Sequence, residues 1–468
     1  MSQVAIKNVR VEALHDQYDV EIALQPNLNV IYGKNGRGKT TLLHILANVL
    51  ELDFERFKHI QFRSIEIETY QGGSVRIRTE PTRSDPQLMT VELDGKLLNP
   101  ITVGTGLSEV EANLLRETLG GRAVYLPAFR AILERSSSEA FYELRERQND
   151  LEAIRKSEMD IARADATRQR PYSSHRASEQ HRLTAAKTIQ CRQWFGSFVP
   201  VIRYPSLNDV RSRLVDEVRD ATIEVSMFEQ SLFSKLFTQV FKAIARSGAV
   251  PPTVDTDELL DKVQAALTSI DELYEGSSTV YGEIRNAVAE AKRNHDVSDG
   301  TAASILSLYA DLLNERTSQH KQSFSKIRDF ESSVNLFLDG KRLVIDERGI
   351  GSSRGGVNVL SDNERPMNLS ALSSGERQVL TMIFCASRLA ERRGIFLVDE
   401  PELSLHVDWQ RSILGEVVRQ AEGRQVIACT HSPEVGADHF DSVQIFDPRP
   451  TQAPQSDLFP DVDSSEDV

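Results

Sequence analysis

The segment GKNGRGKT, from Gly33 to Thr40, constrains the fold of this chain more than any other feature of its sequence. It follows the apolar run LNVIY and precedes TLLHIL, whose leucines have helical spacing, so it lies between a predicted strand and a predicted helix. Glycines in such a loop let backbone N–H groups point inward around an anion, and the helix dipole adds positive potential. The pattern therefore predicts a phosphate-binding loop in an α/β protein.

The positions of this loop have expected roles. Lys39 is expected to reach the β and γ phosphates of a nucleotide, and the hydroxyl of Thr40 to ligate Mg²⁺. The sequence therefore predicts a site for ATP and Mg²⁺. The residues that we assign to nucleotide binding are Gly33, Lys34, Asn35, Gly36, Arg37, Gly38, Lys39, Thr40 and Thr41.

Two carboxylates follow a second apolar run. IFLVDEPE ends its apolar part at Asp399 and Glu400, where the carboxyl end of a buried strand would deliver them to a ligand. Asp399 is expected to hold Mg²⁺ together with Thr40, and Glu400 to polarise the attacking water. The strand VIACTHS follows after one helix and ends on His431, which we place near the γ phosphate. We therefore predict Glu400 and His431 as catalytic residues, and Thr40 and Asp399 as metal ligands.

The stretch LSSGERQVLTMIF, from Leu372 to Phe384, places small polar residues at the head of an apolar helix. Helix capping by Ser373, with Glu376 as its partner, explains this pattern locally. A helix N-terminus is also an anion site, and the loop around Lys39 favours this second interpretation. The residues concerned are Ser373, Ser374, Gly375 and Glu376.

The remaining patterns divide the chain into four regions. Residues 1–135 alternate in polarity and have turn signals at QGG and DG, which predicts an antiparallel β layer beside the first half of an α/β unit. Residues 136–330 lack strand patterns and predict an all-helical insertion. Within it, the spacing of six apolar residues predicts a heptad seam: Leu214, Val218, Ala221, Val225, Phe228 and Leu232. A plain helical core and a coiled-coil arm are equally compatible with this pattern.

The last two regions complete the α/β unit. Residues 331–447 begin with NLFLDGKRLVIDERG, in which DG predicts the turn of a β-hairpin. Strands and helices then alternate, which predicts a mostly parallel sheet that the insertion splits in sequence. Residues 448–468 are acidic and proline-rich, and we expect a flexible tail there.

Composition limits the classes of partner. The net charge of −14 disfavours a protein coated with a DNA-binding surface. Residues 163–192 nevertheless carry seven Lys and Arg residues against two acidic ones, so this segment is either a solvated helix face or a contact for an acidic partner. DNA and a DNA-mimicking phage protein are the candidates. The N-terminus has no signal pattern, no apolar run spans a membrane, and three scattered cysteines suit reducing conditions, so we expect a cytoplasmic location.

These motifs together resemble those of the ABC-type ATPases of the RecF, SMC and OLD branch. GKNGRGKT resembles the Walker A motif, IFLVDEPE the Walker B motif with its catalytic glutamate, and LSSGE the LSGGQ signature. ELSLH, from Glu402 to His406, is similar to the D-loop of this branch, and THS resembles its switch histidine. The resemblance implies that the signature contacts ATP bound by an opposite protomer, in a homodimer or higher homo-oligomer. Gln61 and Gln71 are candidates for the Q-loop glutamine, and Arg130 in YLPAFR is a candidate lining residue.

The domain plan is similar to that of the ATPase subunits of bacterial anti-phage systems, such as AriA of PARIS and next PtuA of Septu. This resemblance implies an ATPase that senses infection and controls a nuclease. The nuclease is expected to be a separate protein, because no nuclease motif is evident in the chain, and the resemblance favours a Toprim nuclease. A DNA-repair or genome-maintenance ATPase of the RecF kind, which binds DNA directly, is the alternative. A scaffold that binds ATP with little turnover is a third interpretation.

Overall fold

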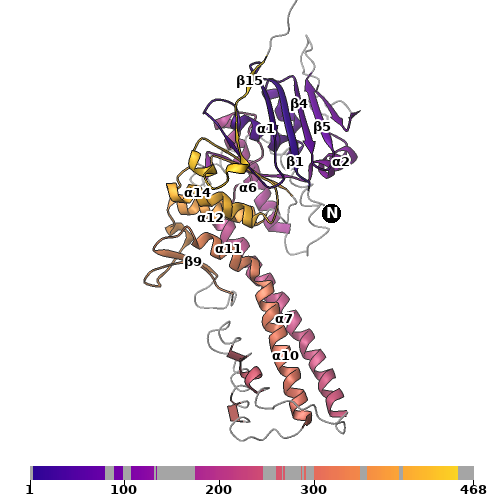
Figure 1. Ribbon diagram of the computed structural model, residues 1–468, viewed down its shortest axis with the longest axis vertical. Coiled ribbons are helices and arrows are strands. Elements are labelled where there is room, and N and C mark those ends of the chain that lie inside the picture. The colour runs from indigo at the N-terminus through magenta and orange to yellow at the C-terminus, as the bar shows by residue number, and fades with distance from the viewer. Residues whose placement is uncertain are drawn as a thin grey trace, which may run out of the picture. The chain divides into compact units, whose positions relative to one another are not determined.

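The computed structural model divides into two compact units, residues Met1–Ser206 with Ser373–Val468 and residues Leu207–Leu372 (Figure 1). These boundaries differ from the predicted ones, since the first unit extends to residue 206 and the second includes residues 331–372. Ion pairs of Arg192 with Asp53 and of Arg203 with Glu51 hold the extension within the first unit. The residues that the structure describes are 4–79, 89–98, 107–130, 133, 174–245, 260–265, 267–268, 286, 289–290, 300–347, 356–388 and 394–451.

A parallel sheet forms the centre of the first unit. Its described strands, in spatial order, are β14 (Val443–Ile445), β3 (Leu28–Tyr32), β13 (Val426–Thr430), β12 (Ile395–Asp399) and β8 (Ala123–Leu126). Every residue of β8, β12 and β13 is buried, as expected for parallel strands that are covered on both faces. The predicted parallel α/β sheet is confirmed, and β12 and β13 are neighbours, so Asp399 pairs in register with Cys429.

The second sheet of this unit is antiparallel and confirms the predicted β layer. Its described strands are β15 (Arg449–Pro450), β2 (Tyr18–Ala23), β1 (Ile6–Leu14), β4 (Ser64–Thr69), β5 (Ser74–Thr79), β6 (Met89–Leu93) and β7 (Lys96–Leu97). Alternate residues of β4 and β5 are buried, so one face of the sheet lies against the core. Strand β15 corrects the predicted start of the tail at residue 448, because Arg449 pairs with Asp19 of β2. Residues 452–468 lie outside the described residues.

Helices of the first unit connect and cover these sheets. They are α1 (Lys39–Glu51), α2 (Glu109–Leu119), α6 (Ser174–Phe195), α12 (Ser374–Ser387) and α14 (Val407–Gln420), with the short 3-10 helices η1 (Phe54–His59), η5 (Pro433–Gly436) and η6 (Phe440–Ser442). Helix α1 packs on β8, β12 and β13 of the parallel sheet, and α12 packs on α14. The phosphate loop therefore opens a helix whose position is set by the central strands.

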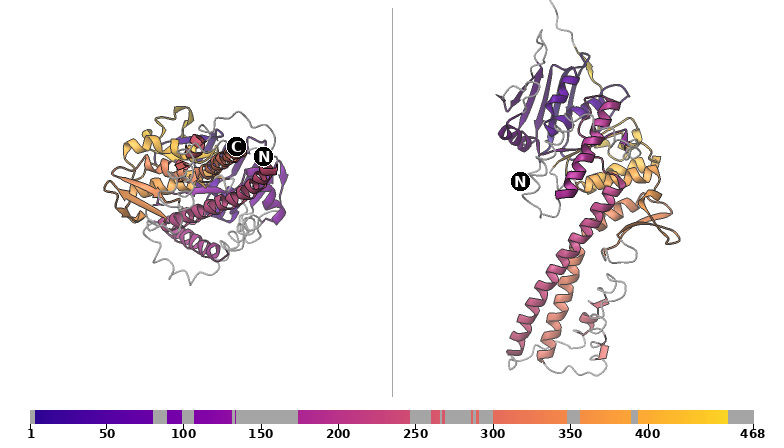
Figure 2. Two further views of the ribbon diagram at one scale, coloured as in Figure 1. Left: turned by 90° about the horizontal axis from the view of Figure 1, so that it is seen from below. Right: turned by 180° about the vertical axis from the view of Figure 1, so that it is seen from behind.

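The second unit contains a long helical pair and a small sheet. Helices α7 (Leu207–Ala245) and α10 (Gly300–Ser323) lie side by side along their length, as both views show (Figure 1 and Figure 2). The predicted seam is confirmed in α7, where five of its six residues are buried and Phe228 is half-buried. Arg316 of α10 forms an ion pair with Glu229 of α7.

The predicted hairpin at the DG turn is wrong. Helix α11 (Ser325–Asn335), which buries Phe330 and Val334 at helical spacing, ends on the first residue of that segment, and residues 336–340 form no strand. Strand β9 (Lys341–Ile345) instead pairs with β10 (Val357–Ser361), which pairs with β11 (Pro366–Met367) before the short helix η4 (Leu369–Ala371). The side-chain amide of Asn335 both donates to and accepts from the backbone of Leu343, on the side of β9 where a hairpin strand was predicted.

Among the described residues, no helix combines the length and the apolar character that crossing a membrane requires.

Candidate nucleotide-binding site

The predicted phosphate loop lies between β3 and α1, as its sequence indicates. Gly38 is the N-cap residue of α1 and has φ +97°, a conformation that is strained for residues with a Cβ atom. The Lys39 side chain is buried, and its Nζ donates to the carbonyl oxygens of Gly33, at 2.6 Å, and Lys34, at 3.1 Å. Lys39 therefore lies within the loop, where its charge can meet the phosphates that the loop is shaped to hold.

Thr40 and Asp399 meet although 359 positions separate them in the sequence. The hydroxyl of Thr40 donates to Oδ2 of Asp399 at 2.9 Å, and Oδ1 of Asp399 is buried without a hydrogen-bond partner within the described part of the chain. Hydroxyl and carboxylate oxygens are hard ligands of the kind that Mg²⁺ prefers. This pair fits the predicted magnesium site, with Oδ1 as an acceptor that no described protein group satisfies.

Burial sets the protonation behaviour of Asp399. It raises the pKa of this carboxyl to about 6, and the negative charge of Glu400 acts in the same direction. The hydrogen bond from Thr40 and the positive charges of Arg130 and Lys39 oppose the shift. The carboxylate is therefore costly to hold charged in the interior, which favours a nearby cation.

Glu400 and His431 also meet at the adjacent ends of β12 and β13. Nδ1 of His431 lies 2.8 Å from Oε2 of Glu400 and 3.2 Å from Oε1 of Glu402. Glu400 has φ +50°, a left-handed conformation that is uncommon for a residue with a long side chain. Non-glycine residues in this conformation concentrate at functional sites.

The sequence pattern gave Glu402 no role of its own beyond the D-loop, but the structure places it under His431. Its side chain is 5% exposed, and Oε1 accepts hydrogen bonds from the hydroxyl of Thr430 and from the backbone N–H groups of His431 and Ser432. The carboxylate therefore orders the chain at the end of β13, next to His431, the predicted catalytic histidine. The second glutamate in DEPE was the available sequence signal for this contact.

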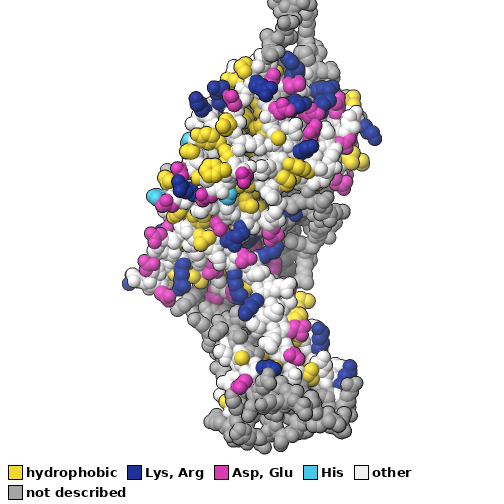
Figure 3. All heavy atoms as spheres, in the orientation of Figure 1, with side chains coloured by type: hydrophobic (Ala, Val, Ile, Leu, Met, Phe, Trp, Pro, Cys, Tyr) yellow, Lys and Arg dark blue, Asp and Glu magenta, His cyan; other side chains and the backbone are white. Residues whose placement is uncertain are grey.

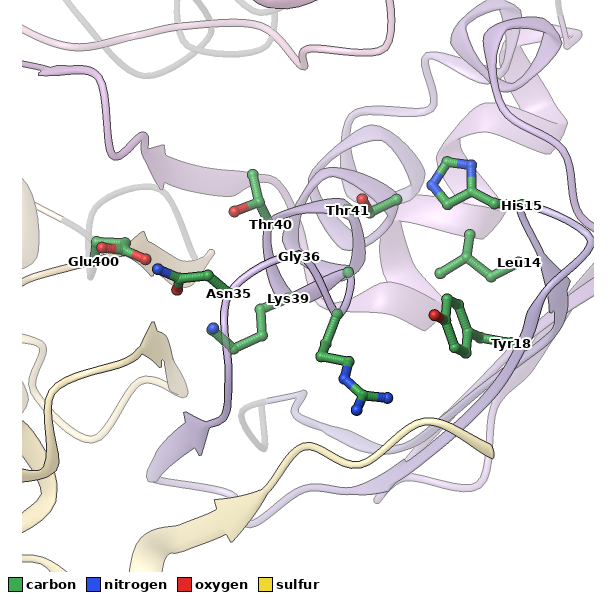
Figure 4. A pocket seen from close by; sticks show the side chains of 11 residues that line it. Leu14, His15, Tyr18, Asn35, Gly36, Lys39, Thr40, Thr41 and Glu400 are labelled. Atoms are coloured by element: carbon green, nitrogen blue, oxygen red, sulfur yellow. The ribbon is translucent and has the colours of Figure 1, made fainter. Parts of the chain in front are cut away.

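A cavity of about 370 Å³ lies beside the loop (Figure 4). In the figure, Asn35 points toward Glu400 on one side of the loop, while Leu14, His15 and Tyr18 lie on the other side. Leu14 ends β1, His15 lies in the turn after it and Tyr18 begins β2, and no local pattern predicted these three residues. The lining residues are Leu14, His15, Tyr18, Asn35, Gly36, Arg37, Gly38, Lys39, Thr40, Thr41 and Glu400.

The LSSGE residues begin α12 and form a capping box. The Ser373 hydroxyl accepts from the N–H of Glu376, whose carboxylate accepts from the N–H of Ser373. Ser373 and Ser374 are exposed, and none of the four residues from Ser373 to Glu376 lines the cavity beside Lys39. The capping interpretation thus holds, and it leaves the two serines exposed.

Gly375 brings α12 close to the D-loop. A Cβ atom at Gly375 would lie 2.6 Å from the carbonyl oxygen of Ser404, which is closer than real Cβ contacts. Ser404 itself has φ +62°. The glycine of the signature is therefore required for packing.

Other sequence candidates lie elsewhere. Neither Gln61 nor Gln71 lines the cavity, and Gln71 accepts a hydrogen bond from the N–H of Ala5. Arg130 is 1% exposed and is not a lining residue, which corrects its predicted place. It lies behind Glu400, where its guanidinium donates to backbone carbonyls.

The basic segment 163–192 contributes two described side chains to internal contacts. Lys187 donates to the carbonyl oxygen of Tyr204, and Arg192 donates to Val199 and pairs with Asp53. These two side chains are therefore engaged in contacts within the first unit. The other five basic residues have side chains outside the described residues.

A family model described as "AAA domain, putative AbiEii toxin, Type IV TA system" matches residues 28–438, a span that holds both halves of the site. The chain belongs to this AAA family. It is thus an ABC-type P-loop ATPase in class, in agreement with the sequence motifs.

This AAA protein is similar to a curated ATPase and to solved Smc head domains. It is 32% identical over 88 residues to the "Retron Ec83 probable ATPase" of Escherichia coli, a stretch that spans 16% of each chain. One similar solved structure is the Smc head domain of Pyrococcus furiosus, with an extended coiled coil and bound to the C-terminal domain of ScpA. It has 13% identity and a TM-score of 0.39, and the match covers 93% of this chain and 92% of that one. The Smc head domain of Pyrococcus yayanosii has 12% identity and a TM-score of 0.40 over 93% of each chain.

Proposed function

We propose that this protein binds and hydrolyses ATP as the sensor or regulatory subunit of a bacterial anti-phage defence system whose effector is a separate nuclease, with a Toprim nuclease as the favoured class. The observation that carries the ATPase part is the convergence of three features at the ends of neighbouring strands. Lys39 lies in the phosphate loop, Thr40 is bonded to Asp399, and Glu400 contacts His431. A single one of these features would be weak support for an ATPase, but together they meet the requirements of phosphoryl transfer.

The chemistry follows from the placement of these groups. The loop N–H groups and Lys39 bind the β and γ phosphates and offset their charge. Thr40 and Asp399 would hold Mg²⁺, which supplies further charge neutralisation when it is bound. Glu400 accepts a hydrogen bond from the attacking water and aligns it, and His431 lies where it can contact the γ phosphate and restrain Glu400. Slow turnover is expected because the chain as a monomer supplies no signature to its own cavity.

Assembly is the second part of the proposal. The two exposed serines at the head of α12 present a helix N-terminus outward, as a phosphate on a second copy of the chain would require. This arrangement supports our proposal of a homodimer or higher homo-oligomer with composite ATP sites. The defence role is supported by the toxin-related family description and by the retron ATPase among the relatives.

The ATPase proposal is tested with Glu400→Gln in the full-length protein. The variant should bind Mg²⁺-ATP as the parent does and lose turnover by about 100- to 1,000-fold, because water activation is lost while phosphate binding remains. It should also accumulate an ATP-bound oligomer. Glu422→Gln is the matched control, since Glu422 also has φ +50° but lies away from the cavity. Equal turnover by Glu400→Gln and the parent would reject the catalytic assignment.

Shared sites are tested by mixing two inactive variants. Lys39→Ala removes the phosphate contact of one chain, and Ser373→Arg blocks the signature of another. If sites are composite, a mixed dimer retains one of its two sites intact. The isolated mixed dimer should therefore have about half of the ATPase activity of the parent dimer. No recovery in isolated mixed oligomers would show that each chain works alone.

The effector is tested by co-purification, with the tagged gene expressed from its natural location. A nuclease encoded beside this gene should co-purify with the tagged protein, and its activity should depend on Lys39. Direct salt-dependent DNA binding by the purified chain would instead favour the repair alternative. Figure 3 shows acidic and basic side chains intermingled on the described part of one face, without a broad basic stripe there.

A further inference from the structure

The turn that carries Glu400 rests on a buried arginine. Arg130 follows β8 in the sequence, is 1% exposed, and has its guanidinium directed at the segment after β12. Nη1 donates to the carbonyl oxygen of Asp399 at 2.9 Å, and Nη2 donates to that of Glu400 at 2.9 Å and that of Pro401 at 3.2 Å. Three successive carbonyls thus converge on one side chain.

Two further contacts extend this cluster. Nη1 donates at 3.2 Å to the carbonyl oxygen of Pro127, the residue that follows β8, and so anchors the arginine to the end of that strand. Nη2 lies 3.4 Å from Oε1 of Gln378, a buried residue of α12 one turn after the signature. Arg130 therefore links β8, the turn of Glu400 and the signature helix within the first unit.

The chemistry of this contact is unusual for a structural arginine. Burial lowers the pKa of Arg130, yet none of its hydrogen bonds within the described part of the chain goes to a carboxylate. A buried charge is costly, and apolar packing often gives equal stability. The planar fork of a guanidinium is suited to fixing several acceptors at once. The feature that it fixes is the left-handed backbone of Glu400.

We propose that Arg130 is a positioning residue for the reaction, one that holds the Glu400 turn in its active geometry and ties it to the signature helix through Gln378. This inference rests on the proposed ATPase function. Arg130 does not line the cavity, so its loss should affect the placement of Glu400 and spare the phosphate loop. The link to α12 gives the signature helix a direct contact with the catalytic turn of the same chain.

The test compares Arg130→Met and Arg130→Lys with Arg203→Met in the full-length protein. Arg203 is a suitable control because it is also largely buried, forms a bidentate pair with Glu51, and lies away from the cavity. Amide hydrogen exchange is measured at residues 399–403 and 373–377, and melting temperature, Mg²⁺-ATP affinity and turnover are measured in parallel.

In Arg130→Met, amide exchange in the 399–403 turn should accelerate. The kcat should fall by about 10- to 100-fold, because a catalytic group misplaced by a fraction of an ångström or more loses much of its effect. The affinity for ATP should stay within about threefold of that of the parent. Arg130→Lys keeps the charge but not the fork, so it should recover only part of kcat. Arg203→Met should lower the melting temperature without a selective loss of kcat.

Two outcomes would overturn the inference. One is unchanged exchange at residues 399–403 in Arg130→Met. The other is a loss of turnover that matches that of Arg203→Met at equal melting temperature. A parent protein without ATP turnover would reject the proposed function, but the exchange data would still decide whether Arg130 holds the turn. If Arg130→Met does not fold, the same comparison is made with Arg130→Lys.

Discussion

The two sides of the candidate site are built by different means. The phosphate-loop side comes from one continuous segment, Gly33 to Thr41, and consists mainly of backbone N–H groups and one lysine. The side opposite the loop is assembled from the ends of β8, β12 and β13, where buried Arg130 donates to the backbone of Glu400 and the Glu400 carboxylate contacts His431. The first side is specified by local sequence, whereas the second depends on packing across the sheet. We therefore expect changes to the first side to remove binding and changes to the second to remove turnover.

Lys39→Ala should have the largest effect, because it removes the lysine of the phosphate-loop side. Removing the ammonium group takes away charge-assisted contacts to the phosphates, so ATP affinity should fall by about 100-fold or more. Titration with a fluorescent ATP analogue measures this loss. Lys58→Ala, at an exposed position of η1, serves as the control. Retention of parent-like affinity in Lys39→Ala would show that the cavity does not hold the phosphates where we place them.

Glu402→Gln should have the next largest effect and addresses the second side. The neutral amide weakens three hydrogen bonds at the end of β13, so His431 should lose its alignment and turnover should fall by about 10-fold or more at unchanged ATP affinity. Steady-state kinetics separates kcat from KM. Glu434→Gln is the control, because Glu434 only pairs with Arg411 at the surface, where such pairs contribute little. A change in KM alone would contradict the assignment.

The same contrast explains which features the sequence predicted. The loop, the carboxylates and the histidine follow strands with clear apolar runs, so their elements and their order could be predicted. The roles of Arg130 and Glu402 depend on which strand ends are neighbours, and no local pattern contains that information. The failed hairpin at the DG turn has a similar cause, since the residues before the turn follow directly on α11, and the side chain of Asn335 bonds to the backbone of Leu343 where a strand was predicted.

Acid should act on two buried groups near the site, His44 and Asp399, in opposite directions. Burial lowers the pKa of His44, a residue of α1 bonded to Tyr125, to about 3. The unfolded chain therefore takes up this proton first, and stability is lost as the pH falls below about 6.5. The pKa of Asp399 is raised to about 6, so the folded chain holds the proton more tightly, and stability increases as the pH falls through 6 toward 3.8.

Two variants separate these contributions, each with a maximum slope of about 1.4 kcal/mol per pH unit. His44→Gln should make the nucleotide-free protein lose less stability between pH 6 and pH 4 than the parent does. Asp399→Asn should make it lose more, because the stabilising proton uptake is gone. Urea unfolding at each pH measures both. Shifts of the same sign in the two variants would show that one of the two burial effects is misassigned.

Tyr18 should have the smallest effect and extends the comparison to the far end of the cavity. Its ring lines the cavity from β2, on the side of the loop away from Glu400, so it can pack on the base of ATP without touching the phosphates (Figure 4). Tyr18→Ala should weaken ATP binding by about 3- to 10-fold, the range of one aromatic contact, while Tyr18→Phe keeps the ring and the affinity. Inorganic tripolyphosphate binding should be equal in all three proteins, because the loop is intact. An equal loss for tripolyphosphate would mean that Tyr18 supports the loop and does not contact the base.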